Sequence, residues 1–400
     1  MTKVADVIVV GGGVIGSAVT YYLAKEGFKV TLVDRGDLAS GTSSACDGNV
    51  LAIDKMPGYD SQMTFQSQKM LAELTNELDY DFEYRCPGST LAVEDEVQDA
   101  VARDWTERQK AAGLPMRYMT GAEVHEDEPM LARDIVGLVE CASDCSLYPM
   151  GLVYGFTYAA RRHGAEVRQF CEVRSILRDS SGRVTGVETS DGPVPGGKVV
   201  LSAGVWTAAI AATAGVDVPI VPRKGQILVT ECAHRIGRRK VMEIGYLMAK
   251  FGGSAKRQVE PDMEKYGIAL VFEPTMQSNY LIGSSREFVG YDNSCDPRVL
   301  GLLAKRAVRF FPVMKDLNVI RSYAGLRPFT PDHLPIVSPV TEVPGLYIAA
   351  GHEGDGIGLA PVTGKIVAQM LAGKPASVPL APLRLDRFKK ENTHDTSADE

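Results

Sequence analysis

The sequence predicts an α/β protein of two interleaved domains, one built on a Rossmann-like parallel sheet and the other an α+β unit on a mostly antiparallel sheet. Three observations support this prediction. The chain has 400 residues, more than twice a typical domain of ~150 residues. It begins with a strand, a glycine-rich turn, a helix and a second strand. Residues 219–320 alternate strand-like runs with turns, which is typical of an antiparallel sheet.

The amino-terminal unit has the clearest pattern. Residues 5–10 (ADVIVV) form a short β-branched run that suits a strand buried on both faces. Residues 14–25 are apolar around most of a helix that ends near Gly27. Residues 28–33 (FKVTLV) are a second buried strand, and Asp34 follows it.

Three glycines and this acid form a dinucleotide-binding pattern. Gly11, Gly13 and Gly16 occupy the G-x-G-x-x-G positions, and Asp34 lies 18 residues after the last of them. Gly11 permits a tight turn, Gly13 lets the backbone approach a pyrophosphate, and Gly16 lets the helix pack closely on the strand. The helix amino terminus offers free amides to phosphates, and Asp34 can accept hydrogen bonds from a ribose diol. A turn without a ligand would not need all four residues.

The later segments follow in order. Residues 36–49 are small and polar without periodicity, which indicates a loop packed close to another group. The helices at 63–78 and 96–113 are expected on the surface, at the edge of the second domain. Further expected elements are helices at 151–163 and 297–310, three short strands between 172 and 195, a buried strand at 199–201, and strands in GQILVTE, IALVFEP and NYLIGSS.

Composition and charge exclude several classes of protein. The net charge is −7, and no basic block supports binding of nucleic acid. The amino terminus lacks the pattern of a signal peptide, and no apolar run is long enough to span a bilayer. The seven scattered cysteines suit reduced thiols in the cytoplasm. Cys141 and Cys145 are expected to be structural, and no metal site is expected.

Four segments together resemble one enzyme family. They are VIVVGGGVIG, the serine-rich SGTSSA, LSAGVW, and AGLRPFTPDHLPIVSP followed by LYIAAGHEGDGIGLAPVTGK. From Asp6 to about Pro382 the chain resembles the flavin-dependent amino-acid and amine oxidoreductases of the D-amino-acid oxidase family. Its pattern is similar to glycine oxidase, sarcosine oxidase and the catalytic subunits of proline, hydroxyproline and opine dehydrogenases.

The resemblance implies a glutathione-reductase-like FAD-binding domain formed by residues 1–75, 150–216 and 324–388. A substrate-binding domain would comprise residues 76–149 and 217–323, and residues 389–400 would be a flexible tail. FAD would be held non-covalently, whereas FMN or an iron–sulfur cluster would enter only through partner subunits. The residues expected at the cofactor are Gly11, Gly13, Val14, Ile15, Gly16, Asp34, Arg35, Gly41, Thr42, Ser43, Ser44, Val173, Ala203, Gly204, Trp206, Gly325, Gly351, Glu353, Gly354, Asp355, Gly356 and Ile357.

The same resemblance suggests four catalytic residues. Arg327, in the GLRP pattern, would hold the substrate carboxylate, because a planar guanidinium suits bidentate binding of that group. A surface arginine or an interdomain ion pair is the alternative. His352 could contact substrate or flavin, or could be a loop histidine that caps amides. Tyr246 and Tyr280 could lie over the flavin face, with core packing as the competing interpretation for both.

The roles of some neighbouring residues stay open. Glu353 and Asp355 would oppose flavin reduction if their carboxylates faced the ring, so they could instead face a partner subunit or a second cofactor. His333 is expected to be structural. Cys46 would lie near the flavin, where a thioether is conceivable, and the role of Lys224 is undecided.

The predicted activity is oxidation of a C–N bond next to a carboxylate, with hydride transfer to flavin N5. Orientation matters more than a strong base here, because the lone pair of an uncharged amine drives hydride loss. We expect a dehydrogenase of an amino or imino acid, of the proline, hydroxyproline, opine or D-amino acid class, that passes electrons to partner subunits. The alternatives are a glycine or sarcosine type oxidase that makes peroxide, a flavin-bearing assembly subunit without turnover, and a nicotinamide-only dehydrogenase.

Overall fold

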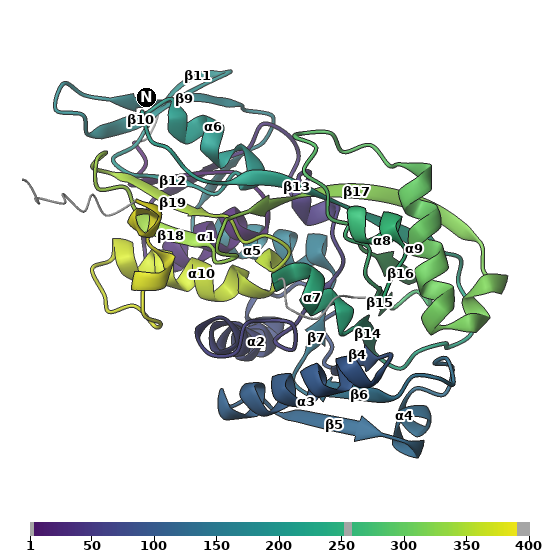
Figure 1. The fold of residues 1–400 in the computed structure, drawn as a ribbon. Helices are drawn as coiled ribbons and strands as arrows, with labels where there is room; N and C mark the ends of the chain where they lie inside the picture. Colours follow the sequence, from purple (N-terminus) through teal and green to yellow (C-terminus); the bar gives the residue numbers. More distant parts are fainter. Residues whose placement is uncertain (1–3, 252–257, 390–400) are drawn as a thin grey trace, which may run out of the picture.

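The structure is a computed structural model that describes residues 4–251 and 258–389. A six-stranded sheet has the strand order β18-β19-β12-β1-β2-β8, and its strands are parallel except for β18 at the edge. The strands are drawn from the beginning, middle and end of the chain (Figure 1). They are β1 (Val7–Val10), β2 (Val30–Val33), β8 (Glu166–Arg168), β12 (Val199–Leu201), β18 (Ile336–Pro339) and β19 (Leu346–Ala350).

Both faces of this sheet are buried, which explains its unbroken apolar strands. Val7 and Val9 of β1 face one hydrophobic cluster, whereas Ile8 and Val10 face another. This alternation follows from the two-residue period of a strand. The expected FAD-type sheet is confirmed, with one buried strand before the glycine turn and a second after the helix that the turn begins.

Four helices cover the first face. They are α1 (Val14–Lys25), α2 (Tyr59–Glu77), α5 (Pro149–Arg162) and α10 (Gly356–Leu371). Helix α1 packs against both α5 and α10, and Gly364 permits this approach because a Cβ there would lie 2.8 Å from the backbone of Ala18. Helix α2 packs on α10 and buries Met63, Leu71 and Leu74 in the cluster beside the parallel sheet. The expectation that α2 lies at the edge of the second domain is therefore wrong, since its apolar face meets α10.

The second face is covered by a three-stranded antiparallel meander and a short helix. The meander comprises β9 (Val173–Arg178), β10 (Val184–Thr189) and β11 (Gly192–Pro195), and the helix is α6 (Thr207–Ala212). Ile176 and Val187 of the meander join Leu201 of the sheet in one cluster. The three short strands predicted between 172 and 195 are confirmed.

An eight-stranded sheet has the order β17-β13-β16-β15-β14-β4-β6-β5 and is antiparallel except where β14 meets β4. This is the mostly antiparallel sheet that the sequence predicts. Helix α9 (Pro297–Phe310) packs beside β13 and β16, and α3 (Glu96–Ala111) beside β5. The strands are β4 (Ser89–Val93), β5 (Met116–Thr120), β6 (Gly137–Cys141), β13 (Val221–Thr230), β14 (Lys240–Glu243), β15 (Val271–Pro274), β16 (Tyr280–Gly283) and β17 (Val319–Phe329).

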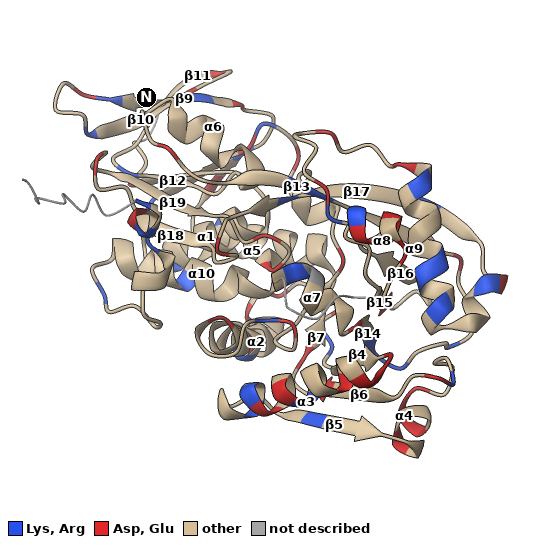
Figure 2. Ribbon diagram, in the orientation of Figure 1, with Lys and Arg blue, Asp and Glu red and all other residues tan. Residues whose placement is uncertain are grey.

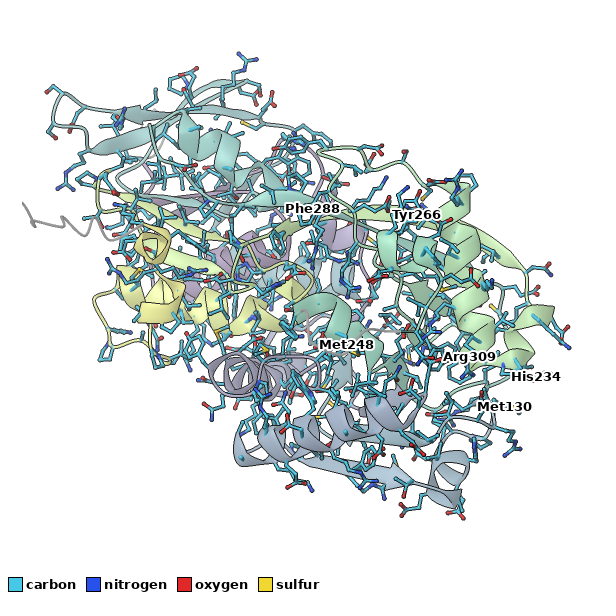
Figure 3. All side chains as sticks on the ribbon, viewed as in Figure 1. Met130, His234, Met248, Tyr266, Phe288 and Arg309 are labelled. Carbon is cyan, nitrogen blue, oxygen red and sulfur yellow. The ribbon has the colours of Figure 1, made fainter. Side chains whose placement is uncertain are left out.

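The helices in this half of the molecule carry many charged residues. Figure 2 shows Lys and Arg along α9, residues of both signs along α3, and Asp and Glu in α4 (Ala122–Asp127). Arg309 at the end of α9 pairs with Asp134 at 2.9 Å, beyond α4 (Figure 3). In the part of the chain that is described, no helix is long and apolar enough to cross a membrane.

Short elements connect the sheets. The polar loop at 36–49 contains a 3-10 turn at Thr42–Ser44, and its last residue begins β3 (Asn49–Val50), which pairs with β7 (Cys145–Ser146). Two short helices, α7 (Gly245–Phe251) and α8 (Pro261–Lys265), lie between β14 and β15.

Candidate active site

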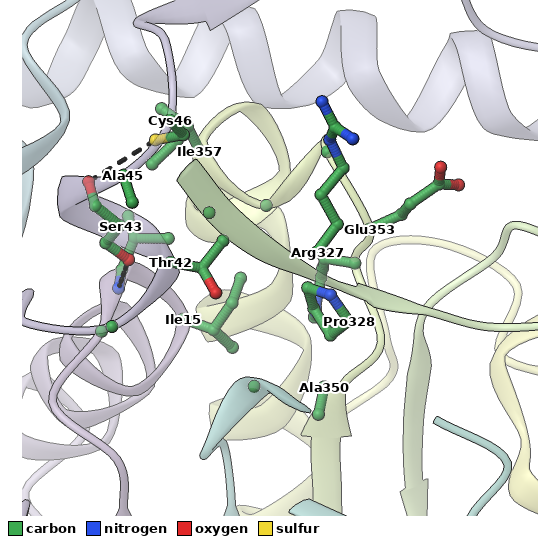
Figure 4. A pocket seen from close by; sticks show the side chains of 18 of the residues that line it. Ile15, Thr42, Ser43, Ala45, Cys46, Arg327, Pro328, Ala350, Glu353 and Ile357 are labelled. Atoms are coloured by element: carbon green, nitrogen blue, oxygen red, sulfur yellow. Dashed lines mark hydrogen bonds between the residues drawn. The ribbon is translucent and has the colours of Figure 1, made fainter. Parts of the chain in front are cut away.

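A cavity of about 520 Å³ lies where the two sheets meet. Its lining includes the glycine turn, the serine-rich loop, the segment after β12, the strands β13 and β17, and the loop before α10. In Figure 4, Arg327 extends from β17, with Ser43 and Cys46 on one side and Glu353 on the other. Nearly all the predicted site residues therefore converge on one cavity, although they come from distant parts of the chain.

The glycine turn at the start of α1 is tightly packed. Gly11 has φ +109°, and a Cβ there would lie 2.6 Å from the carbonyl oxygen of Ser202. A Cβ on Gly16 would lie 1.8 Å from the carbonyl oxygen of Gly11. Gly16 does not line the cavity, because its place is in the contact between helix and strand. The Val14 amide donates to Ser43 Oγ at 3.0 Å, and the next amides have no acceptor earlier in the helix.

Asp34 lines the cavity and faces the glycine turn. Its carboxylate accepts hydrogen bonds from the amides of Gly12 and, at 2.8 Å, Gly36. Burial raises the pKa of Asp34, and these two amides oppose the shift. Next to it, the guanidinium of Arg35 lies 4.1 Å from the centre of the Trp206 ring. Both side chains border the cavity.

The loop before α10 forms the opposite end of the site. Helix α10 begins at Gly356 after Asp355, whose side chain does not cap it. The first intrahelical bond in this turn runs from Leu359 to Asp355, so the amides of Gly356, Ile357 and Gly358 have no acceptor earlier in the helix. All three residues line the cavity. Two helix amino termini thus border one cavity, which favours an anionic or electron-rich ligand.

Glu353 is buried and paired inside the chain. Arg223 forms an ion pair with one carboxylate oxygen of Glu353, and His333 Nδ1 lies 2.8 Å from the other. Burial, together with the charge of Arg223, lowers the pKa of His333 to about 4, so the ring is neutral at neutral pH. The idea that this acid faces a partner subunit or a second cofactor is therefore wrong.

Asp355 belongs to a buried cluster of four charges that we call the lysine–aspartate ring: Asp54, Lys55, Lys250 and Asp355. Lys55 Nζ lies 2.9 Å from Asp355 and also pairs with Asp54. Lys250 Nζ lies 3.2 Å from Asp355 and 3.5 Å from Asp54. Burial raises the pKa of Asp355, but the two lysines lower it much further. This second acid is also neutralised within the chain and not by a partner.

Arg327 is placed by the pairing of β13 with β17. Gly225 and Gly325 lie opposite each other in this ladder, and a Cβ on Gly225 would lie 2.2 Å from an Arg327 nitrogen. The absence of that Cβ lets the guanidinium lie across the strand. Arg327 Nη1 donates to the carbonyl of Ser285 at 2.9 Å. Within residues 4–251 and 258–389, no carboxylate forms an ion pair with it, so the interdomain ion pair considered above is not found there.

Two of the other residues predicted to be catalytic also border the cavity. His352 is buried, and its Nε2 lies 3.0 Å from Thr363 Oγ1. Burial lowers the pKa of His352 to about 3, which keeps the ring neutral. The guanidinium of Arg286 lies 4.2 Å from the centre of the Tyr246 ring. Burial raises the pKa of Tyr246, but the charges of Arg286 and Lys250 outweigh it and leave a net lowering.

Tyr280 and Ser44 do not border the cavity. The Tyr280 ring stacks on Phe272 in the core of the eight-stranded sheet, and its hydroxyl contacts backbone groups of His234 and Ile236. The expectation of a place over the flavin is wrong for Tyr280, because its strand position points to the face that α9 covers. Ser44 is exposed, and its hydroxyl bonds back to Gly41.

Three residues bring unpaired polar atoms to the cavity wall. Asn49 has neither a donor nor an acceptor partner for its buried amide, Thr64 has none for its hydroxyl, and His352 has none for Nδ1, among the described residues. All three line the cavity. Buried polar atoms are rarely left unpaired, so a ligand that fills the cavity would supply the partners.

The cations beside Glu353, Asp355 and Tyr246 could not be identified from the sequence. Lys55, Arg223, Lys250 and Arg286 stand in short segments without a recognisable motif. The only available signal was indirect: two acids in a glycine-rich loop near a ligand must be paired if they are buried. That rule predicts cations but does not identify them.

Comparison with known proteins agrees with this geometry. A sequence model described as FAD-dependent oxidoreductase matches residues 6–370. Glycine oxidase of Geobacillus kaustophilus is 29% identical over 395 residues, covering 97% of this chain and 98% of that protein. Hydrogen cyanide synthase subunit HcnC of Pseudomonas aeruginosa is 26% identical, covering 98% of each. The crystal structure of glycine oxidase from Geobacillus kaustophilus has a TM-score of 0.85 at 27% identity, covering 97% of this chain and 100% of that chain.

Proposed function

The chain belongs to the family of FAD-dependent oxidoreductases, and within it we propose a dehydrogenase that oxidises the C–N bond of an amino or imino acid and passes the electrons to partner subunits. The proposal concerns the substrate class, the residue that holds it and the electron acceptor. It includes the proline, hydroxyproline, opine and D-amino acid classes of substrate.

The residues around the cavity fit FAD. Gly11 lets the turn pack on the Ser202 backbone, where a Cβ would lie 2.6 Å from the carbonyl oxygen, and Gly13 borders the cavity. The Ile15 amide at the start of α1 has no acceptor earlier in the helix and could bind a pyrophosphate, and Asp34 is within the same wall. The free amides at the start of α10 suit the carbonyl edge of the flavin ring, where negative charge gathers on reduction. Cys46 lines the cavity as a thiol, because burial raises its pKa. This supports non-covalent binding.

Arg327 is the observation that carries the proposal. A guanidinium has five N–H donors, and one of them is used by the Ser285 carbonyl. The buried arginines Arg223 and Arg306 both pair with acids of this chain, whereas Arg327 has no such partner among the described residues. A substrate carboxylate would accept two of the remaining N–H donors of Arg327 in a bidentate pair. Such a pair would fix the α-carbon relative to the cofactor.

The bound flavin would supply a two-electron acceptor for the α-carbon hydride. The chain would then supply orientation and exclusion of water. His352 beside the cavity is neutral and so places no positive charge there. No strong base is required when the amine is uncharged. Tyr246 borders the cavity close to Arg286 and Lys250, and we assign it to positioning of the substrate.

The electron acceptor has two candidates. HcnC is named as a subunit of a synthase, which supports transfer to companion subunits. Glycine oxidases of similar identity favour the second candidate, an oxidase that reduces oxygen to peroxide. A different function, that of a flavin-bearing assembly subunit without turnover, is less consistent with Arg327, because its guanidinium has no acid partner among the described residues.

The substrate class and the acceptor can be tested in one experiment. The purified FAD-loaded protein is mixed without oxygen with a panel of amino and imino acids, and the flavin absorbance is followed before and after air is admitted. Bleaching by one class identifies the substrate, slow return of colour supports a dehydrogenase, and fast return indicates an oxidase. A protein that no member of the panel bleaches would contradict the proposal.

Arg327→Met tests the carboxylate role directly. The loss of a charge-assisted bidentate pair should lower kcat/KM by about 10²-fold or more, mainly through KM. Arg321→Met is the matched control, because Arg321 lies on the same strand and is exposed. Unchanged kcat/KM in Arg327→Met, with normal FAD content, would remove Arg327 from the site.

A further inference from the structure

Two cysteines from separate segments share one tyrosine hydroxyl, away from the cavity already described. Cys86 Sγ lies 3.1 Å from Tyr84 Oη, and Cys145 Sγ lies 3.2 Å from the same oxygen. Cys86 is exposed and Cys145 is buried. All seven cysteines are free thiols in the structure, so the two sulfur atoms are neighbours that are not joined.

The backbone register places these cysteines opposite each other. The Arg85 amide donates to the Ser146 carbonyl at 2.9 Å, and the Ser146 amide donates to the Arg85 carbonyl at 2.8 Å. Arg85 and Ser146 are thus a hydrogen-bonded antiparallel pair. This pair is an isolated bridge. Continuing its register by one residue would set Cys86 opposite Cys145 as a non-hydrogen-bonded pair, whose side chains would share one face and whose Cα atoms would lie about 4.5 Å apart. Disulfides accept Cα separations of about 4.4–6.8 Å.

The surroundings favour a thiolate on the exposed sulfur. The hydrogen bond from Cys145 and, to a smaller extent, the one with the Tyr84 hydroxyl outweigh burial and together lower the pKa of Cys86 to about 6. The same contact with Cys86, together with burial, raises the pKa of Cys145, which therefore stays protonated. Cys145 also lines a second cavity of about 220 Å³, whose wall is rich in cations: Arg85, Arg235, Arg238, Arg239 and Lys240.

We propose that Cys86 and Cys145 form a redox pair that hydrogen peroxide converts into a disulfide. The Cys86 thiolate attacks the O–O bond, becomes a sulfenic acid and releases hydroxide, which takes up a proton. The Cys145 sulfur then attacks the Cys86 sulfur, its proton leaves with the sulfenic oxygen as water, and the S–S bond forms. Two thiols lose two electrons, and one peroxide becomes two waters. The inference is independent of the proposed substrate.

The disulfide would close the base of one lobe. The chain enters the lobe after Cys86, forms β4, α3, β5, α4 and β6, and leaves it at Cys145. A bond between these two positions would lower the conformational entropy of the whole segment in the unfolded state. Oxidation is therefore expected to raise the Tm of the protein and to slow proteolysis inside the lobe.

The test treats the purified FAD-loaded protein with an equimolar amount of hydrogen peroxide, traps free thiols with an alkylating agent, and maps the peptides by mass spectrometry. The expected result is a peptide pair joined through Cys86 and Cys145, the loss of two free thiols, and a higher Tm that dithiothreitol reverses. Oxidation of other cysteines, or sulfinic acid at Cys86 without the joined peptide, would overturn the proposal.

Three variants make the test specific. In Cys86→Ser, which has one thiol fewer, peroxide treatment should change neither the Tm nor the number of free thiols. Cys232→Ser is the matched control, because Cys232 is also exposed, and it should still form the disulfide. Tyr84→Phe should shift the midpoint of Cys86 alkylation above pH 6, because the shared hydroxyl is lost. An unmoved midpoint would show that the tyrosine does not activate the pair.

Discussion

Two glycine-rich turns border the large cavity and place a helix amino terminus there, but different interactions hold them in position. The turn at Gly11–Gly16 carries no charge of its own, and its packing depends on backbone atoms within a few ångströms. The loop at 351–358 carries Glu353, which is buried, and Asp355, whose side chain is 12% exposed. The first turn can be interpreted from its own residues. The second depends on cations brought from residues 55, 223 and 250.

This difference has an energetic cause. A glycine contact is local, and its cost appears as soon as a side chain is added. A buried carboxylate costs several kcal/mol unless it is paired. The loop at 351–358 can therefore hold its acids only because distant segments fold against it. The comparison predicts that charge changes in the second loop harm stability more than glycine changes in the first.

The largest effect is expected from Asp355→Asn. The substitution leaves Lys55 and Lys250 with Asp54 as the only acid in the lysine–aspartate ring, and loss of one partner from a buried ion pair costs about 3–5 kcal/mol. Urea unfolding of the FAD-loaded protein measures the change. The double variant Asp355→Asn, Lys55→Met removes one charge of each sign and should recover part of the loss. A cost below about 1 kcal/mol for Asp355→Asn would show that the ring contributes little.

A smaller loss is expected from Gly16→Ala. The new Cβ would lie 1.8 Å from the Gly11 carbonyl oxygen, so α1 must shift, at about 1–3 kcal/mol. The FAD content per chain, from flavin absorbance, should fall in parallel. Gly301→Ala is the control, because Gly301 is exposed in α9 with open space around its Cα. It should gain about 0.5–1 kcal/mol. Equal behaviour of the two variants would end the argument for close packing at Gly16.

The smallest effect concerns pH and His333. The ring has a folded pKa of about 4, below the unfolded value of about 6.5. Above pH 6.5 neither state binds the proton, and between about 6.5 and 4 only the unfolded chain does, so stability is lost as pH falls through this window. The ring is partly exposed, so its share is about 1–2 kcal/mol. His333→Asn should flatten the fall in urea midpoint between pH 7 and 4.5, and an unchanged slope would rule out this origin.

The elements of the fold were largely predictable from local patterns. The helix predicted at 14–25 and the strand at 199–201 match the structure residue for residue. Apolar periodicity and glycine positions are short-range signals, which explains this agreement. The placement of α2 was not predictable, because its sequence shows an apolar face but not that α10 covers it.

The site divides in the same way. The glycine turn, the serine-rich loop and Arg327 were identified from motifs and do border one cavity. Tyr280 shows the limit, because a tyrosine in a strand can face either side of the sheet, and register decides between them. Its stacking on Phe272 is a property of the assembled core.

The sequence thus carried the strand–turn–helix unit, the family of the protein and most of the residues that border its cavity, because these depend on neighbours within a few positions. Folding in three dimensions settled which charges meet. Lys55 and Lys250 pair with Asp355, and Cys86 faces Cys145. Such pairings join residues far apart in the chain, and they are set by the free energy of burying charge and by strand register, neither of which is visible along one segment.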